Sequence, residues 1–145
     1  MTGKSYKIIM PLKVKLGKQD YIVNLNQYRN WHYHVMNGVK KRYQEIAAIP
    51  ICKLPKFDEI RLEFKLFKGS KRKTDRSNVL SIHEKFFCDA LTKCQIIEDD
   101  SDEYIHSTTY LPTELDRVNP RVEITLYEVL SPKVEESRQG GALHG

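Results

Sequence analysis

The stretch from Lys68 to Glu103 reads KGSKRKTDRSNVLSIHEKFFCDALTKCQIIEDDSDE and is the most informative part of the chain. It begins with a basic run that encloses one carboxylate, Asp75. An apolar segment with helical spacing follows from about Asn78 to Cys94, and five carboxylates then lie within the six residues 98–103. Carboxylates at this density repel one another unless protons, water or cations disperse the charge, and Mg²⁺ prefers carboxylate oxygens. The stretch therefore predicts a helix between a basic segment and a candidate metal-binding segment.

Two interpretations of these charged segments are open from the residues alone. If the helix folds its two ends toward a shared cleft, Asp75 and the acidic cluster could hold a divalent cation beside a basic surface. A basic surface with a carboxylate-bound metal is the chemistry of a nuclease. In the alternative interpretation, the acidic run is a solvated loop and the basic run is a solvated face, as blocks of like charge commonly are.

Hydrophobic periodicity predicts the elements around this stretch. Apolar and charged residues alternate through 60–66, the two-residue period of a half-buried strand, so Asp75 lies just beyond the end of a strand. Apolar residues at spacings of three and four predict another helix over residues 30–48, in which Gly38 weakens the expectation of an unbroken element. The helix within the informative stretch is expected to be capped by Ser77 or Asn78.

The remaining segments read as strands and set the fold class. Residues 5–16 are expected to form one strand, and the run at 21–25 is expected to pair with it as a hairpin. Further strands are expected at 104–111 and 122–126. The order strands, helix, strand, helix, strands predicts an α/β (α+β) fold, in which a single layer of mixed β-sheet has helices packed on one face.

Length and composition bound the class of protein. The 145 residues suit one domain, which we place at residues 1–130, and few apolar side chains in residues 131–145 predict a disordered tail. The formal charge of +5 favours an anionic partner such as nucleic acid. We expect no signal peptide and no membrane association, since no run approaches the ~20 apolar residues of a membrane span. Three cysteines without a CxxC pair indicate reduced thiols and a cytoplasmic location.

Several side chains are candidates for contact with nucleic acid. The candidate phosphate-binding residues are Lys40 and Lys41 on the helix over 30–48, and Lys71, Arg72, Lys73 and Arg76 in the basic run. The aromatic residues Tyr28, Trp31 and Tyr33 could stack on bases, although packing in the core is their commoner use. Lys85 and Asp89 lie four residues apart on one helix, so they form either a surface ion pair or a lysine placed over a phosphate beside a carboxylate.

At the level of motifs, Arg72 to Asp100 resembles the RusA-like Holliday junction endodeoxyribonucleases of phages and prophages. That family has a basic run, a DxDN motif, a lysine on the following helix, a DAL segment and a double Asp. The corresponding segments here are KRK at Lys71 to Lys73, DRSN at Asp75 to Asn78, Lys85, DALTK at Asp89 to Lys93, and Asp99-Asp100. The chain departs from the pattern at Ser77, where the family has Asp, and by about one extra helical turn before Lys85.

The resemblance implies a homodimeric enzyme of DNA recombination, DNA repair or phage DNA processing. It would bind four-way DNA junctions and nick symmetrically related strands by hydrolysis that depends on Mg²⁺, or on Mn²⁺ in its place. Asp75 and Asp100 would hold the metal with Asp99 adjacent, and Ser77 would be a weak, neutral ligand. Lys85 would neutralise phosphate charge or position the attacking water. The alternative is a nucleic-acid-binding protein without cleavage, either a decayed resolvase or an unrelated basic module.

Overall fold

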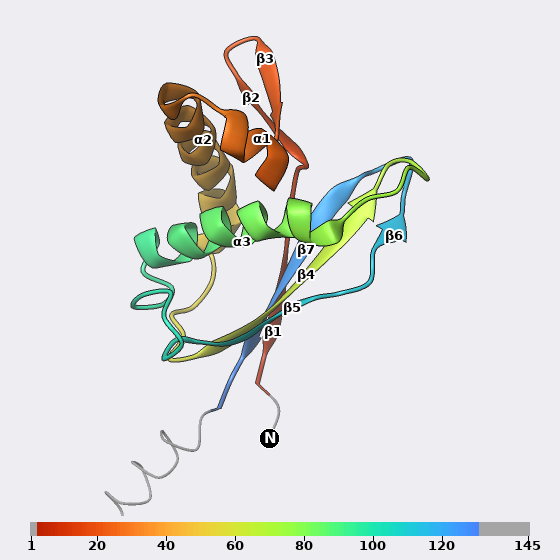
Figure 1. Ribbon diagram of the computed structural model, residues 1–145. Coiled ribbons are helices and arrows are strands. Elements are labelled where there is room, and N and C mark those ends of the chain that lie inside the picture. Colours follow the sequence, from red (N-terminus) through yellow and green to blue (C-terminus); the bar gives the residue numbers. More distant parts are fainter. Residues whose placement is uncertain (1–2, 131–145) are drawn as a thin grey trace, which may run out of the picture.

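The computed structural model of the protein describes residues 3–130 (Figure 1). The predicted disordered tail, 131–145, lies outside the described residues. The strands and helices follow in this order: β1 (Ser5–Met10), β2 (Lys13–Leu16), β3 (Gln19–Ile22), α1 (Leu25–Asn30), α2 (Tyr33–Ile51), β4 (Ile60–Lys68), α3 (Arg76–Lys93), β5 (Ile105–Tyr110), β6 (Glu114–Leu115) and β7 (Arg121–Glu128). None of the helices in this part of the chain has the length and apolar character needed to cross a bilayer.

The main sheet has five strands and is mixed, as predicted. Its order is β1-β7-β4-β5, with β6 pairing the end of β4. Both pairings of β7 are antiparallel, whereas β4 and β5 run parallel and are joined by α3. All three helices lie on one side of this sheet, and the β2–β3 hairpin lies beyond them (Figure 1). The predicted fold class, a mixed α+β sheet with helices on one face, is confirmed.

The alternating segments fold as the period of two requires. In β4, Ile60, Leu62 and Phe64 are fully buried, and the charged residues between them point to the opposite face of the sheet. The same alternation buries Val122 and Ile124 in β7. The hydrophobic faces of these strands pack against α3, so the sheet holds the helix and the segments at its two ends in fixed positions.

The single strand expected over residues 5–16 is wrong. The segment breaks at Pro11 into β1, which pairs with β7, and β2, which pairs with β3 in the separate hairpin. Proline cannot donate a hydrogen bond to a ladder and restricts the residue before it, so a strand readily ends there. The hairpin itself is confirmed, and Gly17 supplies the positive φ of +65° in its turn.

The helix expected over 30–48 is observed as α2, with the shorter α1 before it. Gly38 does not interrupt α2. A Cβ atom at Gly38 would lie only 2.7 Å from Cδ2 of Leu16, so the missing side chain is the place where the hairpin packs on the helix. Glycine is therefore used here for close packing rather than for a helix break.

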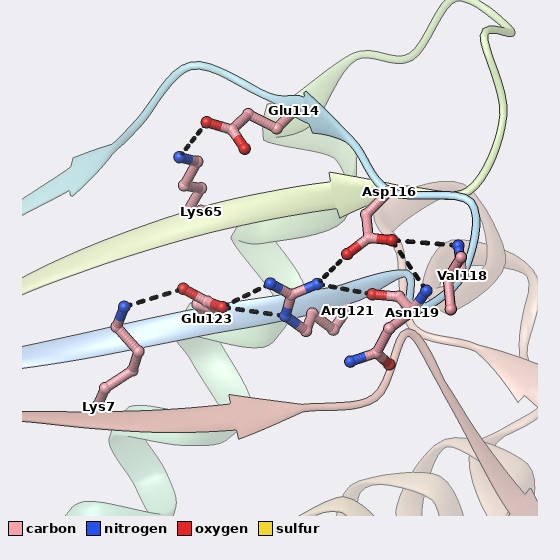
Figure 2. A network of polar contacts seen from close by, with 8 residues as sticks. All are labelled: Lys7, Lys65, Glu114, Asp116, Val118, Asn119, Arg121 and Glu123. Atoms are coloured by element: carbon pink, nitrogen blue, oxygen red, sulfur yellow. Dashed lines mark hydrogen bonds and ion pairs between the residues drawn. The ribbon is translucent and has the colours of Figure 1, made fainter.

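The helix-free face of the sheet carries a paired network of charges (Figure 2). Arg121 binds Asp116 at 2.7 Å and Glu123 at 2.8 Å, and Glu123 also binds Lys7 at 3.2 Å. The guanidinium of Arg121 lies 3.8 Å from the centre of the Phe67 ring, which it covers. The basic groups of this network are thus already matched with carboxylates.

A buried polar pair links α2 to α3. The Tyr43 hydroxyl and Nδ1 of His83 share a hydrogen bond of 2.8 Å, and both side chains are fully buried. Nε2 of His83 has no hydrogen-bond partner among residues 3–130. Burial penalises the charged imidazolium and lowers the pKa of His83 to about 3.

This depressed pKa predicts a loss of stability in mild acid. An unfolded histidine takes up a proton near pH 6.5 while folded His83 stays neutral, so the stabilisation is complete above that pH and declines as the pH falls toward 3. Between about pH 7.5 and about pH 5, the His83 contribution to the unfolding free energy should fall by about 2 kcal/mol. Urea titrations across this range should show the decline, and a His83→Gln protein should show a flatter profile. An equally steep profile in that variant would exclude His83 as the cause.

Candidate functional site

Asp75 caps the N-terminus of α3, so the expectation that Ser77 or Asn78 caps this helix is wrong. Oδ1 of Asp75 accepts hydrogen bonds from the Ser77 hydroxyl at 2.7 Å and from the Ser77 backbone N–H at 3.1 Å. These two bonds, the side-chain bond foremost, lower the pKa of Asp75. Ser77, the residue that departs from the family motif, thus donates to the Asp75 carboxylate and helps to keep it ionised.

A cavity lies at the start of α3. This start cavity of about 490 Å³ is lined by Asp75 together with Arg29 of α1 and Lys73 of the basic run. The backbone N–H of Asn26 donates to Oδ1 of Asn78 at 3.0 Å, which ties α1 to the first turn of α3. The start of α3 is therefore a pocket with one carboxylate and two nearby cationic groups.

A second cavity, of about 220 Å³, lies between the middle of α3 and the beginning of β5. Its acidic, basic and imidazole side chains belong to Glu84, Lys85, Asp100, Asp102 and His106. The fold therefore brings two of the sequence-predicted site residues, Lys85 and Asp100, to one cavity. We call this set of five residues the Lys85–Asp100 cavity.

Lys85 does not pair with Asp89, because the Asp89 carboxylate binds another residue. The interpretation of Lys85 and Asp89 as an ion pair is wrong: the Asp89 carboxylate binds Nζ of Lys40 on α2 at 2.9 Å. Lys85 makes no ion pair with any residue in 3–130. Lys40, proposed from the sequence as a phosphate ligand, is therefore partly neutralised by Asp89, whereas Lys41 is exposed.

Asp75 and Asp100 do not lie in the same cavity. Lys85 lies nine positions after Arg76 in α3, which corresponds to a rise of about 13 Å along the helix. The basic segment enters α3 at one end and the acidic segment leaves from the other (Figure 1). Within residues 3–130, no group of three or more His, Cys, Asp or Glu side chains is arranged to hold a metal ion.

The acidic segment divides into structural and cavity-facing carboxylates. Asp99 accepts the Ser101 backbone N–H at 2.7 Å, and hydrogen bonds from Ser101 lower its pKa. Glu98 accepts the Tyr104 hydroxyl at 2.7 Å, a bond that raises the pKa of Tyr104 to about 12. Asp99, expected beside the metal, thus helps to form the turn, whereas Asp100 and Asp102 line the cavity.

Sequence reasoning did not select Glu84 or His106 as site residues, and it included Asp102 only as a member of the acidic cluster. Glu84 accepts the Tyr110 hydroxyl at 2.5 Å, and burial followed by this bond raises the pKa of Tyr110. Glu84 directly precedes Lys85, and His106 follows the acidic segment at the start of β5. The signal for all three would have been the parallel β4-α3-β5 connection, which returns the chain beneath the helix.

The basic run before α3 remains exposed. Lys71, Arg72, Lys73 and Arg76 are all exposed, and none of them makes an ion pair within residues 3–130. Nζ of Lys68 donates to the Arg72 carbonyl at 3.2 Å and so closes the loop that carries them. Four cationic side chains therefore stand beside Asp75 without local neutralisation by a second carboxylate.

No protein-family model and no curated protein matches this chain.

The capping role of Asp75 gives a prediction that separates its structural and chemical contributions. Asparagine caps a helix about as well as aspartate, whereas alanine does not. We expect Asp75→Asn to unfold close to the wild-type temperature and Asp75→Ala to unfold roughly 3 °C lower. Thermal melts followed by circular dichroism measure both. Equal losses in the two variants would show that the negative charge, and not the cap, stabilises the start of α3.

Proposed function

We propose that this protein is a Mg²⁺-dependent, structure-selective endodeoxyribonuclease that nicks four-way (Holliday) DNA junctions. The observation that carries the proposal is the presence of Lys85, Asp100 and Asp102 around one cavity. In phosphate-handling sites Mg²⁺ is commonly held by one or two carboxylates, while water and phosphate oxygens fill its other positions. Asp100 and Asp102 fit that pattern, as they would for Mn²⁺. When bound, the ion would activate water and stabilise charge on the attacked phosphate.

Lys85 has a role of its own in this proposal. Its side chain lines the same cavity and makes no ion pair within residues 3–130, so its ammonium group can neutralise a phosphate oxygen. A lysine acts at a phosphate as a compact point charge with three donors. The cavity volume of about 220 Å³ leaves room for several waters beside such a contact.

Asp75 enters the proposal through the expected homodimer. Asp75 and Asp100 line different cavities of one chain, so we place an ion held by both carboxylates between two copies. Asp75 of one copy would then complete the Lys85–Asp100 cavity of the other. Two such sites in a symmetric dimer would suit the paired nicks that resolve a junction.

The exposed basic run supports DNA as the partner. Lys71, Arg72, Lys73 and Arg76 offer cationic groups that can displace counterions from a phosphate backbone. A resemblance to the RusA-like resolvases accounts for the order of the basic run, Asp75, Lys85 and Asp100. A role in recombination, repair or phage DNA processing in the bacterial cytoplasm belongs to the same proposal.

The second candidate function is nucleic-acid binding without cleavage. It is favoured by the placement of Asp75 and Asp100 at different cavities, since a chain acting alone would lack their shared ion. Its weakness is that Asp100 and Asp102 would then repel DNA without contributing to any reaction.

A nicking assay separates the two functions. The purified protein is incubated with a synthetic four-way junction, linear duplex or single-stranded DNA of matched sequence, in Mg²⁺, Mn²⁺ or EDTA. We expect paired nicks in the junction with either metal, none in EDTA and none in the linear duplex. Tight binding without nicks in either metal would establish the binding function instead. Equal cleavage of all three DNAs would contradict selectivity for junctions, and absence of binding would contradict both functions.

A further inference from the structure

The net positive charge is concentrated in the N-terminal part of the chain, because few carboxylates lie there. Residues 1–57 contain eleven Lys and Arg and only two Asp and Glu, whereas residues 58–145 contain thirteen and seventeen. The net positive charge of the protein therefore comes from the segment that forms β1, the hairpin, α1 and α2, and not from the segment that carries the candidate active site. Such an asymmetry indicates a separate surface for a polyanion.

The β2–β3 hairpin presents part of this charge to solvent. Val14 is buried and Tyr21, opposite it in the register, packs edge-on against Trp31 with 6.0 Å between ring centres. Directly paired residues share a face of an antiparallel ribbon, so the alternate positions Lys13 and Lys15 face away from the core. Both lysines are exposed, as is Lys18 beside the turn.

The ammonium groups of these three lysines are not neutralised by neighbouring carboxylates of the described chain. None of them forms an ion pair within residues 3–130. Asp20, opposite Lys15, is the only carboxylate of the hairpin and lies beyond ion-pair distance from it. The aromatic anchoring holds the ribbon on α1 and α2, so the lysines project from a fixed support rather than from a free loop.

The hairpin adjoins a second set of cationic groups at the start of α3. Tyr28 of α1 packs against both Trp31 and Phe86, which places α1 between the hairpin and α3. Arg29 of α1 then lines one cavity with Lys73 of the basic run. Figure 1 shows the hairpin, α1 and the start of α3 following one another along the same part of the molecule.

We propose that Lys13, Lys15 and Lys18, together with Arg29, form a basic strip that binds the phosphate backbone of a DNA duplex arm leading to the start of α3. This inference rests on the proposed function for the identity of the polyanion as duplex DNA. The strip contacts phosphates and not bases, because flexible lysines on an exposed ribbon supply charge without a fixed pattern of donors. It therefore contributes affinity that depends steeply on salt and little on sequence.

The test compares two triple variants of equal charge. In the strip variant, Lys13, Lys15 and Lys18 become Gln, and in the control variant the exposed lysines Lys4, Lys53 and Lys56 become Gln. Lys53 and Lys56 follow α2, at the end opposite the hairpin contact near Gly38. Binding to a fluorescent linear duplex and to a four-way junction is measured by anisotropy in EDTA, over a series of salt concentrations.

The strip variant should lose roughly tenfold in affinity, and its plot of log K against log salt should become shallower by about 2 to 3, because each lost phosphate contact removes about 0.9. The control variant should keep the wild-type slope. A wild-type slope in the strip variant would contradict the strip without bearing on the proposed nuclease activity. Equal losses of affinity in both variants would show that only the net charge of the protein matters, which would also contradict the strip. Failure of the wild-type protein to bind either DNA would reject the proposed function along with the strip. Unchanged thermal melts confirm that both variants are folded.

Discussion

The Asp100→Asn protein is expected to nick a four-way junction about a hundredfold more slowly than the wild-type protein, or not at all, in Mg²⁺. The substitution removes the negative charge that would hold the ion at the Lys85–Asp100 cavity, while the amide fills nearly the same space. Junction binding in EDTA should persist, since the basic residues are unchanged. Initial nicking rates from denaturing gels, with anisotropy for binding, measure both quantities. The matched control is Glu103→Gln, which removes one charge from the same acidic segment outside the cavity and should nick at the wild-type rate.

The proposed sharing of the site between two copies extends this experiment. Asp75→Asn and Asp100→Asn proteins should each be inactive alone. Co-expressed, they should form mixed dimers in which one site keeps both Asp75 and Asp100, and the preparation should recover about a quarter of the wild-type nicking rate by random pairing. A preparation that contains mixed dimers, binds junctions and still does not nick would show that each chain supplies a complete site. A wild-type rate in either single variant would remove that residue from the site.

The largest effect on stability is expected at Phe87, which joins α3 to the sheet. Its fully buried ring meets Phe64 of β4 nearly at a right angle, with 6.2 Å between the ring centres. Truncation to Ala would leave a cavity between the layers, and we expect the unfolding free energy to fall by roughly 3–5 kcal/mol. Urea unfolding measures the loss. Tyr33→Ala provides the aromatic control: its side chain is 66% exposed, and its removal should change stability by less than about 0.5 kcal/mol. Similar losses in the two variants would contradict the described packing.

Local pattern was enough to predict most of the sheet and the long helices. The alternation in β4 and β7 is readable because every second side chain enters the core. The same reasoning failed over residues 5–16, where Lys13 and Lys15 continue the alternation while Pro11 transfers the chain to another sheet. A period of two reports which face is buried, but it does not report which strand lies alongside.

Two residues of the candidate site were predictable from the sequence, whereas its arrangement was not. Lys85 and Asp100 were chosen from motif order, yet their meeting depends on the path of the chain from α3 back to β5. The pairing of Asp89 with Lys40 depends on a contact between helices far apart in sequence, which a spacing of four residues cannot reveal. The distance between Asp75 and Asp100 likewise follows from the length of α3 and not from either motif.

The charge network on the helix-free face has a consequence for how DNA would approach. Arg121 and Lys7 both pair with Glu123, and Arg121 also pairs with Asp116. The carboxylates therefore offset much of the positive electrostatic potential of these cations in the surrounding solution. A polyelectrolyte drifting toward the protein would feel attraction mainly from the opposite side. The orientation of the first encounter would thus be selected before any contact forms, with the helices and hairpin leading.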